Sequence, residues 1–138
     1  MWLLANDSAN CELTNFNLLA GKFGIQFTQK SRNMVQDDIF EQGAIYISGK
    51  KNPVFKTRKV FLKEISALSV TAPAKPVVTE GGDVIIAIAK YGKGAVLAVG
   101  DPWLYNEYVD GRRLPADFDN LGAAEDIAEW LLKNAKKK

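Results

Sequence analysis

The chain has 138 residues, of which 47% are hydrophobic and 25% are charged, a composition typical of one globular domain. Histidine is absent and Cys11 is the single cysteine, which excludes Ser-His-Asp and Cys-His catalysis, histidine-ligated zinc and an internal disulfide. The net charge of +2 owes its sign to the lysines at 136–138, so it gives no indication of nucleic-acid binding. The longest apolar run, 84–89, is too short to span a membrane. We therefore expect one domain over residues 1–138 with no cofactor, metal site, nucleic-acid partner or membrane partner.

The chain begins with a pattern typical of a strand, a polar loop and a helix. Residues 2–5 form a continuous apolar run, which predicts a strand buried on both faces. The polar loop 6–12 follows, and apolar residues then recur at helical spacing until Gly24, which predicts the helix end. This apolar stripe comprises Leu13, Phe16, Leu19, Ala20 and Phe23. We expect Ser8 or Asn10 to cap the helix, because both side chains can accept a hydrogen bond from a free backbone N–H group.

The middle of the chain predicts short strands separated by loops. Residues 28–42 are polar and have no clear periodicity, so we expect a long surface loop there. Segments 44–47, 59–65 and 67–70 are rich in residues that favour strands. The two prolines within 73–76 then indicate a connection between elements.

The last third of the chain predicts a β-hairpin and a helix. Strands at 83–90 and 95–99 are joined by a turn that contains glycine. A helix over 120–134 follows, with acidic residues before it and lysines after it, as the helix dipole favours. The apolar stripe expected to be buried is Leu121, Ala124, Ile127, Ala128, Leu131 and Ala135. These elements predict an α/β layered sheet, and because the chain opens on a buried-type strand we expect the later part of a larger domain.

Two polar loops each follow an apolar strand, and they are the candidate binding site. The first is 6–12 and the second is 100–108. If the two strands are parallel, both loops lie at the carboxyl edge of the sheet, where α/β proteins bind ligands. The predicted ligand-binding residues are Asn6, Asp7, Asn10, Asp101, Trp103, Tyr105, Asn106 and Glu107. Aromatic rings beside amides and carboxylates suit a sugar, whose C–H face stacks while its hydroxyl groups need polar partners.

The same residues also have purely structural explanations. Asp7 and Asn10 are typical of a helix start, and Asp101 before proline is typical of a turn. Asp7 and Asp101 could also form the acid and base pair of a glycosidase. Cys11 lacks flanking glycines and no histidine exists to activate it, so a structural thiol is the better interpretation. We assign no catalytic residue.

Three segments together resemble a known family. They are residues 3–27, 52–57 and 91–112, the last of which contains Gly-Asp-Pro-Trp-Leu-Tyr-Asn-Glu-Tyr. They resemble the C-terminal domain appended to bacterial unsaturated rhamnogalacturonyl hydrolases of glycoside hydrolase family 88 and the related family 105. The resemblance covers essentially the whole chain. It implies a flavodoxin-like, class I glutamine amidotransferase-like fold.

The resemblance also implies a function. The hydrolase chemistry of that family belongs to a separate α/α-barrel domain, so this chain would be a non-catalytic accessory domain of a pectin-degrading enzyme, in contact with a pectin-derived saccharide or with the catalytic domain. No catalytic residue of the family maps onto this chain, and the amidotransferase cysteine and histidine have no counterpart in it. In that family the appended domain also has an earlier half, before the strand that corresponds to residues 2–5. The resemblance further implies that the protein is periplasmic or secreted.

Two other classes of function stay open at this point. The first is a stand-alone amidotransferase-like hydrolase that uses the loops of Asp7 and Asp101. The second is an interaction module whose exposed first strand completes its sheet with a partner, including a second copy in a homodimer.

Overall fold

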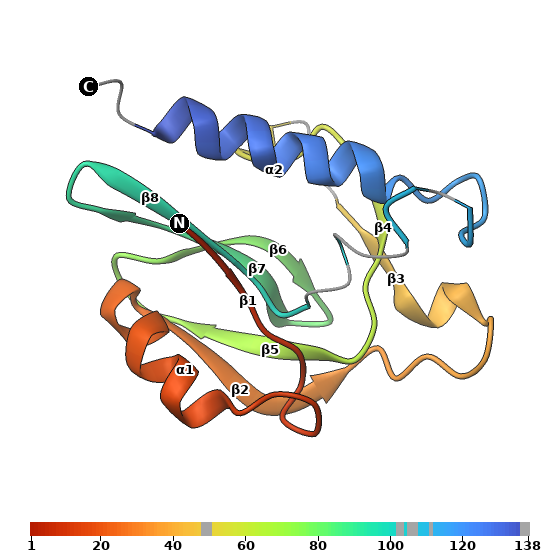
Figure 1. The fold of residues 1–138 in the computed structure, drawn as a ribbon, viewed down its shortest axis with the longest axis horizontal. Coiled ribbons are helices and arrows are strands. Elements are labelled where there is room, and N and C mark those ends of the chain that lie inside the picture. The colour runs from red at the N-terminus through yellow and green to blue at the C-terminus, as the bar shows by residue number, and fades with distance from the viewer. Residues whose placement is uncertain (48–50, 102–103, 105–107, 111, 136–138) are drawn as a thin grey trace.

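The computed structural model describes residues 1–47, 51–101, 104, 108–110 and 112–135, and it places two helices on opposite sides of a curled mixed sheet (Figure 1). In chain order the elements are β1 (Trp2–Leu4), α1 (Leu13–Ala20), η1 (Gly21–Phe23), β2 (Ile25–Arg32), η2 (Phe40–Gly43), β3 (Ala44–Tyr46), β4 (Lys59–Phe61), β5 (Ile65–Val70), β6 (Lys75–Glu80), β7 (Asp83–Tyr91), β8 (Gly94–Val99) and α2 (Asn120–Asn134), where η denotes a short 3-10 helix. No helix among these residues is long and apolar enough to cross a membrane.

The main sheet has six strands in the order β1-β8-β7-β5-β2, and β6 pairs with β7 as well. β1 runs parallel to β8, with Trp2 opposite Leu97 and Leu4 opposite Val99. The other strand pairs in the described residues are antiparallel, including the separate β3–β4 pair. The α/β expectation is therefore confirmed as a mixed α/β fold, in which the parallel pairing that the candidate site requires is present between β1 and β8.

Alternate residues of β8 face two hydrophobic cores. Val96 and Ala98 pack into the core under α1, whereas Leu97 and Val99 pack into the core under α2, which includes Ile127. A strand covered on both faces has no polar side, which is why β8 is a continuous apolar run in the sequence. β1 contacts both cores in the same way, as its apolar sequence predicted.

The predicted hairpin and the predicted last helix are both confirmed. β7 and β8 pair along their length, and α2 runs from Asn120 to Asn134. The prediction of which α2 residues are buried was only partly right. Leu121 and Ala128 are exposed, while Asn120 and Asp126 are buried. The two polar side chains are buried because each makes hydrogen bonds to the backbone of a neighbouring segment.

The prediction of a long loop over residues 28–42 was wrong for its first part. β2 continues to Arg32 and pairs antiparallel with β5, with Phe27 opposite Leu68 and Ser31 opposite Ser66. The register shifts between Phe27 and Ser31, and β2 is the last strand on its side of the sheet. An irregular edge strand can be polar, so its residues lack the apolar alternation that would have predicted it.

The prediction of a connection at 73–76 was right for residues 73 and 74 and wrong from Lys75 onward. β6 begins at Lys75 and includes Pro76, which lies opposite Ala87 of β7. Proline has no N–H to donate, so in sheets it is confined to edge strands and strand ends. β6 pairs with β7 alone in the described sheet, and it is therefore a position where proline is allowed.

Glu12, and not the predicted Ser8 or Asn10, caps α1. The Glu12 carboxylate accepts hydrogen bonds from the backbone N–H groups of Asn15 at 2.9 Å and Thr14 at 2.7 Å, and these bonds lower the pKa of Glu12. The helix starts later than expected because the preceding loop first closes a turn of its own.

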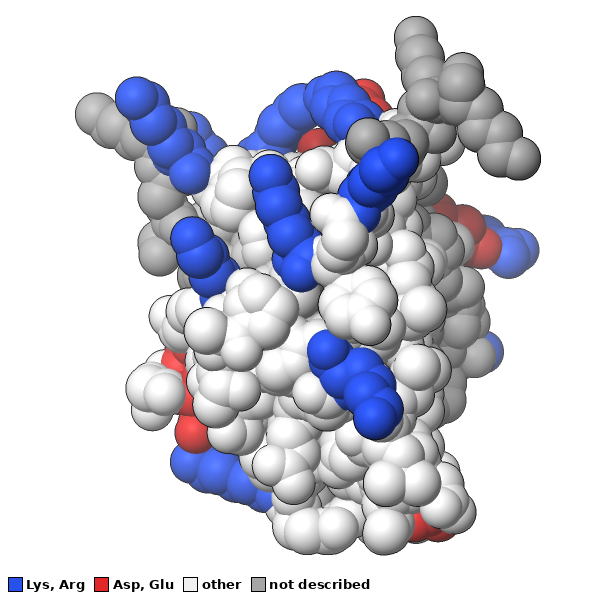
Figure 2. Space-filling model, turned by 90° about the vertical axis from the view of Figure 1, so that its left-hand side faces the viewer, with Lys and Arg blue, Asp and Glu red and all other residues white. Residues whose placement is uncertain are grey.

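Charges are distributed unevenly between the two ends of β7. The end at the β7–β8 turn presents lysines and few carboxylates (Figure 2). At the other end, Arg32 bonds to Asp83 at 2.7 Å and to Glu80 at 3.0 Å, and Lys30 bonds to Asp83 at 2.7 Å. Lys30 and then Arg32 lower the pKa of Asp83. These ion pairs join β2 to the β6–β7 turn.

Candidate functional site

The two polar loops of the sequence start at one edge of the sheet, as predicted. β1 and β8 are parallel neighbours, so the residues after Leu4 and after Val99 leave the sheet side by side. The segment before β5 passes between them. Asp7 N donates to Glu64 O at 3.0 Å, and Asp101 Oδ2 accepts from Lys63 N at 3.0 Å. The two loops are therefore joined by a third segment that sequence reasoning did not place there.

Asp7 holds the first loop together. Its side chain is 1% exposed, and its Oδ1 accepts from Asn10 Nδ2 at 2.8 Å. Its backbone oxygen accepts from the N–H groups of Asn10 and Cys11, while Asn6 Oδ1 accepts from Asp7 N. These hydrogen bonds are typical of a turn, so they agree with the structural explanation of Asp7 and Asn10 given by the sequence.

Asp101 has a comparable role in the second loop. It is fully buried, and its carboxylate bonds to the backbone of Lys63. A saccharide on the outside of this edge would therefore meet other groups before it reached Asp7 or Asp101. The other four predicted residues, Trp103, Tyr105, Asn106 and Glu107, lie outside the described residues.

A hollow of about 460 Å³ adjoins this edge. It is lined by Asp38, Phe40, Tyr108 and Arg113, and Tyr108 is the last residue of the second predicted loop, 100–108. Lys63 Nζ lies 5.8 Å from the centroid of the Tyr108 ring, which connects the hollow to the segment between the two loops. Hollows of this size accommodate small molecules, and two aromatic rings with one cation and one carboxylate suit a sugar that carries a charge.

The wall of the hollow is an aromatic cluster. The Phe61 ring packs against Phe40 at 5.6 Å, Tyr108 at 4.7 Å and Phe118 at 6.1 Å between centroids. Lys59 lies 4.0 Å above the Phe118 ring centroid. A ring that is fixed by other rings loses little conformational freedom when a ligand stacks on it.

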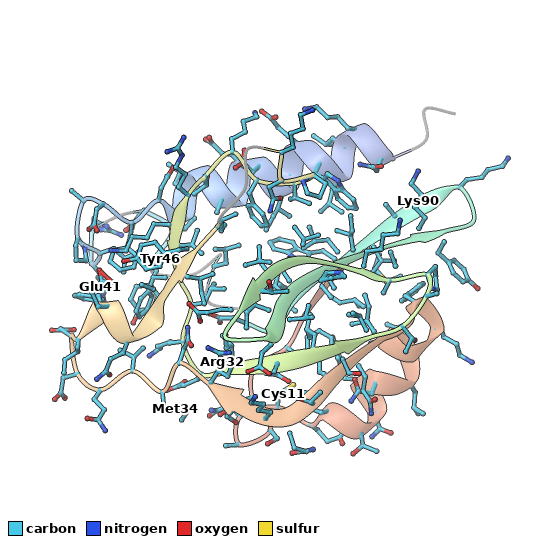
Figure 3. The ribbon with its side chains drawn as sticks, turned by 180° about the vertical axis from the view of Figure 1, so that it is seen from behind. Cys11, Arg32, Met34, Glu41, Tyr46 and Lys90 are labelled. Atoms are coloured by element: carbon cyan, nitrogen blue, oxygen red, sulfur yellow. The ribbon has the colours of Figure 1, made fainter. Side chains whose placement is uncertain are left out.

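Lys59 ties this wall to the segment before α2. Its ammonium group bonds to the carboxylates of Asp117 and Glu41, and those two bonds raise the pKa of Lys59. Tyr46 Oη donates to the same Glu41 carboxylate at 3.3 Å, and the two side chains lie at one end of the molecule in Figure 3. The 3-10 helix that carries Phe40 is thus fixed to both neighbouring segments.

Among the described residues of this region, no nucleophile lies beside a group that could act as its base. Cys11 is half-buried, and its Sγ lies 3.9 Å from the backbone oxygen of Glu12. The chain has no histidine that could take the thiol proton. Within the described ranges, no group of three or more acidic or cysteine side chains is placed to hold a metal ion.

None of the four residues that line the hollow was among the predicted ligand-binding residues, although Tyr108 ends the second predicted loop. Asp38 and Phe40 lie in a stretch predicted as surface loop, and Arg113 lies between the hairpin and α2. No spacing or periodicity links segments that are so far apart in the chain. The signal in the sequence that could have pointed to Arg113 is its position shortly after the loop 100–108, which is rich in aromatic residues.

Comparison with known proteins shows a similarity of fold to a solved structure. No family model and no curated protein matches the chain. A solved structure described as "mmIFT52 N-terminal domain" matches with a TM-score of 0.71 at 17% sequence identity. The match covers 99% of this chain and 65% of that one. What the two share is the fold, which is glutamine amidotransferase-like with a curled mixed sheet of six strands and two helices.

Proposed function

We propose that this chain is a non-catalytic accessory domain that binds saccharide on behalf of a rhamnogalacturonan-degrading glycoside hydrolase. The observation that carries the proposal is the hollow lined by Phe40, Tyr108, Arg113 and Asp38 beside the carboxyl edge of β1 and β8. The sequence resemblance to the domain appended to such hydrolases supports the same function. The proposal includes a flavodoxin-like fold, in a periplasmic or secreted enzyme.

The lining residues have complementary roles toward a sugar acid. The half-buried Phe40 ring offers a face for the C–H groups of the sugar. The exposed Arg113 guanidinium matches a uronate carboxylate, which it can bind through two parallel hydrogen bonds. Asp38 is exposed and can accept hydrogen bonds from sugar hydroxyl groups. These described residues would recognise a ligand by stacking and hydrogen bonding.

Replacing Arg113 with glutamine is expected to weaken binding of rhamnogalacturonan oligosaccharides about 10- to 100-fold, because hydrogen bonds to charged groups contribute about 1.5–3 kcal/mol. Isothermal titration calorimetry of the wild type and the variant measures this change. Arg112→Gln is the matched control, since Arg112 is also exposed and precedes Arg113 in the chain but does not line the hollow. Equal affinities of the Arg113 and Arg112 variants, or a wild type that binds no oligosaccharide, would contradict the proposal.

One observation favours a second candidate function, an interaction module. β1 is the end strand of the sheet on its side, and among the described strands it pairs with β8 alone. An end strand offers a row of backbone groups to another strand. If β1 pairs with a second copy of the chain, sedimentation at high protein concentration will show a dimer, and a monomer at every concentration would contradict pairing between copies.

A further inference from the structure

Four lysines from three separate segments gather at the end of the sheet that holds the β7–β8 turn. Lys90 and Lys93 belong to the hairpin, Lys22 belongs to η1, and Lys75 begins β6, opposite Ile88 of β7. We call Lys22, Lys75, Lys90 and Lys93 the basic end.

Two contacts bring these segments together. The Phe23 ring of η1 meets the Tyr91 ring of the hairpin edge-on at 5.1 Å between centroids. Thr71 N donates to Gly24 O at 2.9 Å, which places the start of β6 beside η1. The lysines therefore share one surface because of tertiary packing, although they are far apart in the sequence.

The basic end carries one sign of charge only. Segments 13–24, 65–79 and 84–100 contain no aspartate or glutamate. Within the part of the chain that the structure describes, none of the four lysines forms an ion pair. Figure 2 looks onto this face, where Lys and Arg side chains are spread over an uncharged surface and carboxylates lie only toward its margin. Such a face attracts anions over a distance of several ångströms.

An exposed aromatic ring lies among these lysines. Tyr91 is 59% exposed, yet the contact with Phe23 holds its ring in position. A fixed, exposed ring between cations suits a ligand that has both apolar faces and negative charges. Because the charges are dispersed and not gathered in a pocket, they suit a polymer better than a single small anion.

The residue types favour carboxylates over phosphates. Arginine recognises phosphate with two parallel hydrogen bonds and stacks on bases, and the basic end contains no arginine. Lysine acts as a point charge whose ammonium group can donate to a carboxylate from many directions. Proteins that bind single-stranded nucleic acid use several stacking rings along a groove, whereas one tyrosine is exposed here.

We propose that the basic end binds an extended anionic polysaccharide whose sugar residues carry uronate carboxylates. This inference rests on the proposed function and deepens it: the hollow near Arg113 takes one sugar residue, and the basic end holds the polymer by its charge. The two surfaces lie at opposite ends of the molecule, since Figure 3 places Lys90 far from Glu41 and Tyr46. The domain would thus keep a polymer near the enzyme independently of the recognition of one residue.

The test compares Lys90→Glu and Lys75→Glu with Arg58→Glu, which changes the net charge equally. All three residues are exposed, and Arg58 lies beside Lys59, whose partners Glu41 and Asp117 are remote from the hairpin turn. Affinity electrophoresis in polygalacturonate, with neutral galactan as the reference polymer, measures binding. We expect each lysine variant to bind polygalacturonate about fivefold or more weakly, and Arg58→Glu to bind like the wild type. Wild-type binding should also weaken between about 50 and 200 mM salt.

Each other outcome has a definite meaning. If both lysine variants bind polygalacturonate like the wild type, the inference is wrong, while the proposed function stands as long as Arg113→Gln weakens oligosaccharide binding. If the wild type binds neither polygalacturonate nor rhamnogalacturonan oligosaccharides, both fail. If double-stranded DNA or an acidic globular protein competes as well as polygalacturonate does, the assignment to a polysaccharide is overturned. Thermal melting of each variant checks that the fold is unchanged.

Discussion

Replacing Asn120 with alanine is expected to lower the free energy of unfolding by about 2–4 kcal/mol. Asn120 is the first residue of α2 and is 2% exposed. Its Oδ1 accepts from Phe61 N at 2.8 Å and its Nδ2 donates to Phe61 O at 2.9 Å, so one side chain satisfies both backbone groups of a buried residue. Alanine would leave both groups without a partner in a core that excludes water. Urea denaturation of the two proteins measures the difference.

Leu121→Ala is the matched control for this prediction. Leu121 is the next residue of the same helix but is 53% exposed, so its truncation should change stability by about 0.5 kcal/mol or less. An Asn120→Ala variant as stable as Leu121→Ala would mean that the two hydrogen bonds do not join α2 to β4. Because β4 carries Phe61, the loss should also loosen the aromatic wall beside the hollow.

Gly100→Ala is expected to destabilise the fold by about 3 kcal/mol, at the upper end of what overpacking usually costs. A Cβ atom at Gly100 would lie 2.0 Å from the backbone oxygen of Ser66. The two segments are this close because Ser66 N donates to Gly100 O at 2.9 Å, and a backbone atom cannot turn away as a side chain can. The substitution would push the start of β5 away from the loop of Asp101. Denaturant unfolding measures the loss.

Gly94, the first residue of β8, is the matched control for Gly100. A Cβ atom at Gly94 would lie 3.7 Å from its nearest neighbour, the backbone oxygen of Tyr91, which is an ordinary contact. Gly94→Ala should therefore be close to neutral in stability. If Gly100→Ala is equally well tolerated, the close approach of the two segments at this edge is not required for folding.

Elements with complete local signals were the predictable ones. The bounds of α2 follow from the cap at Asp119 and from the lysines at its end, and the β7–β8 hairpin follows from two apolar runs around a glycine turn. β2 and β6 lacked such signals, because an edge strand needs neither apolar alternation nor a full set of N–H donors. Their strand structure comes from pairing with β5 and β7, which no local pattern reports.

Some features of the candidate site were also predictable from the sequence, and others were not. That the loops after β1 and β8 would meet was predictable, since parallel neighbouring strands end at the same edge. That Asp7 and Asp101 would be buried there was not, because their burial depends on the segment that passes between them. The hollow and the basic end were equally out of reach, since each combines residues from segments distant in the chain.

By itself, the sequence of this protein determined which chemistries were excluded and where the β7–β8 hairpin and the last helix would form. The absence of histidine and the single cysteine decide the first, and short-range apolar periodicity and capping residues decide the second. Only the tertiary structure decided which polar groups are buried, which aromatic rings form the wall of the hollow and which lysines share a face. The physical reason is that burial and proximity depend on contacts between distant segments, whereas periodicity and capping act within a few neighbouring residues.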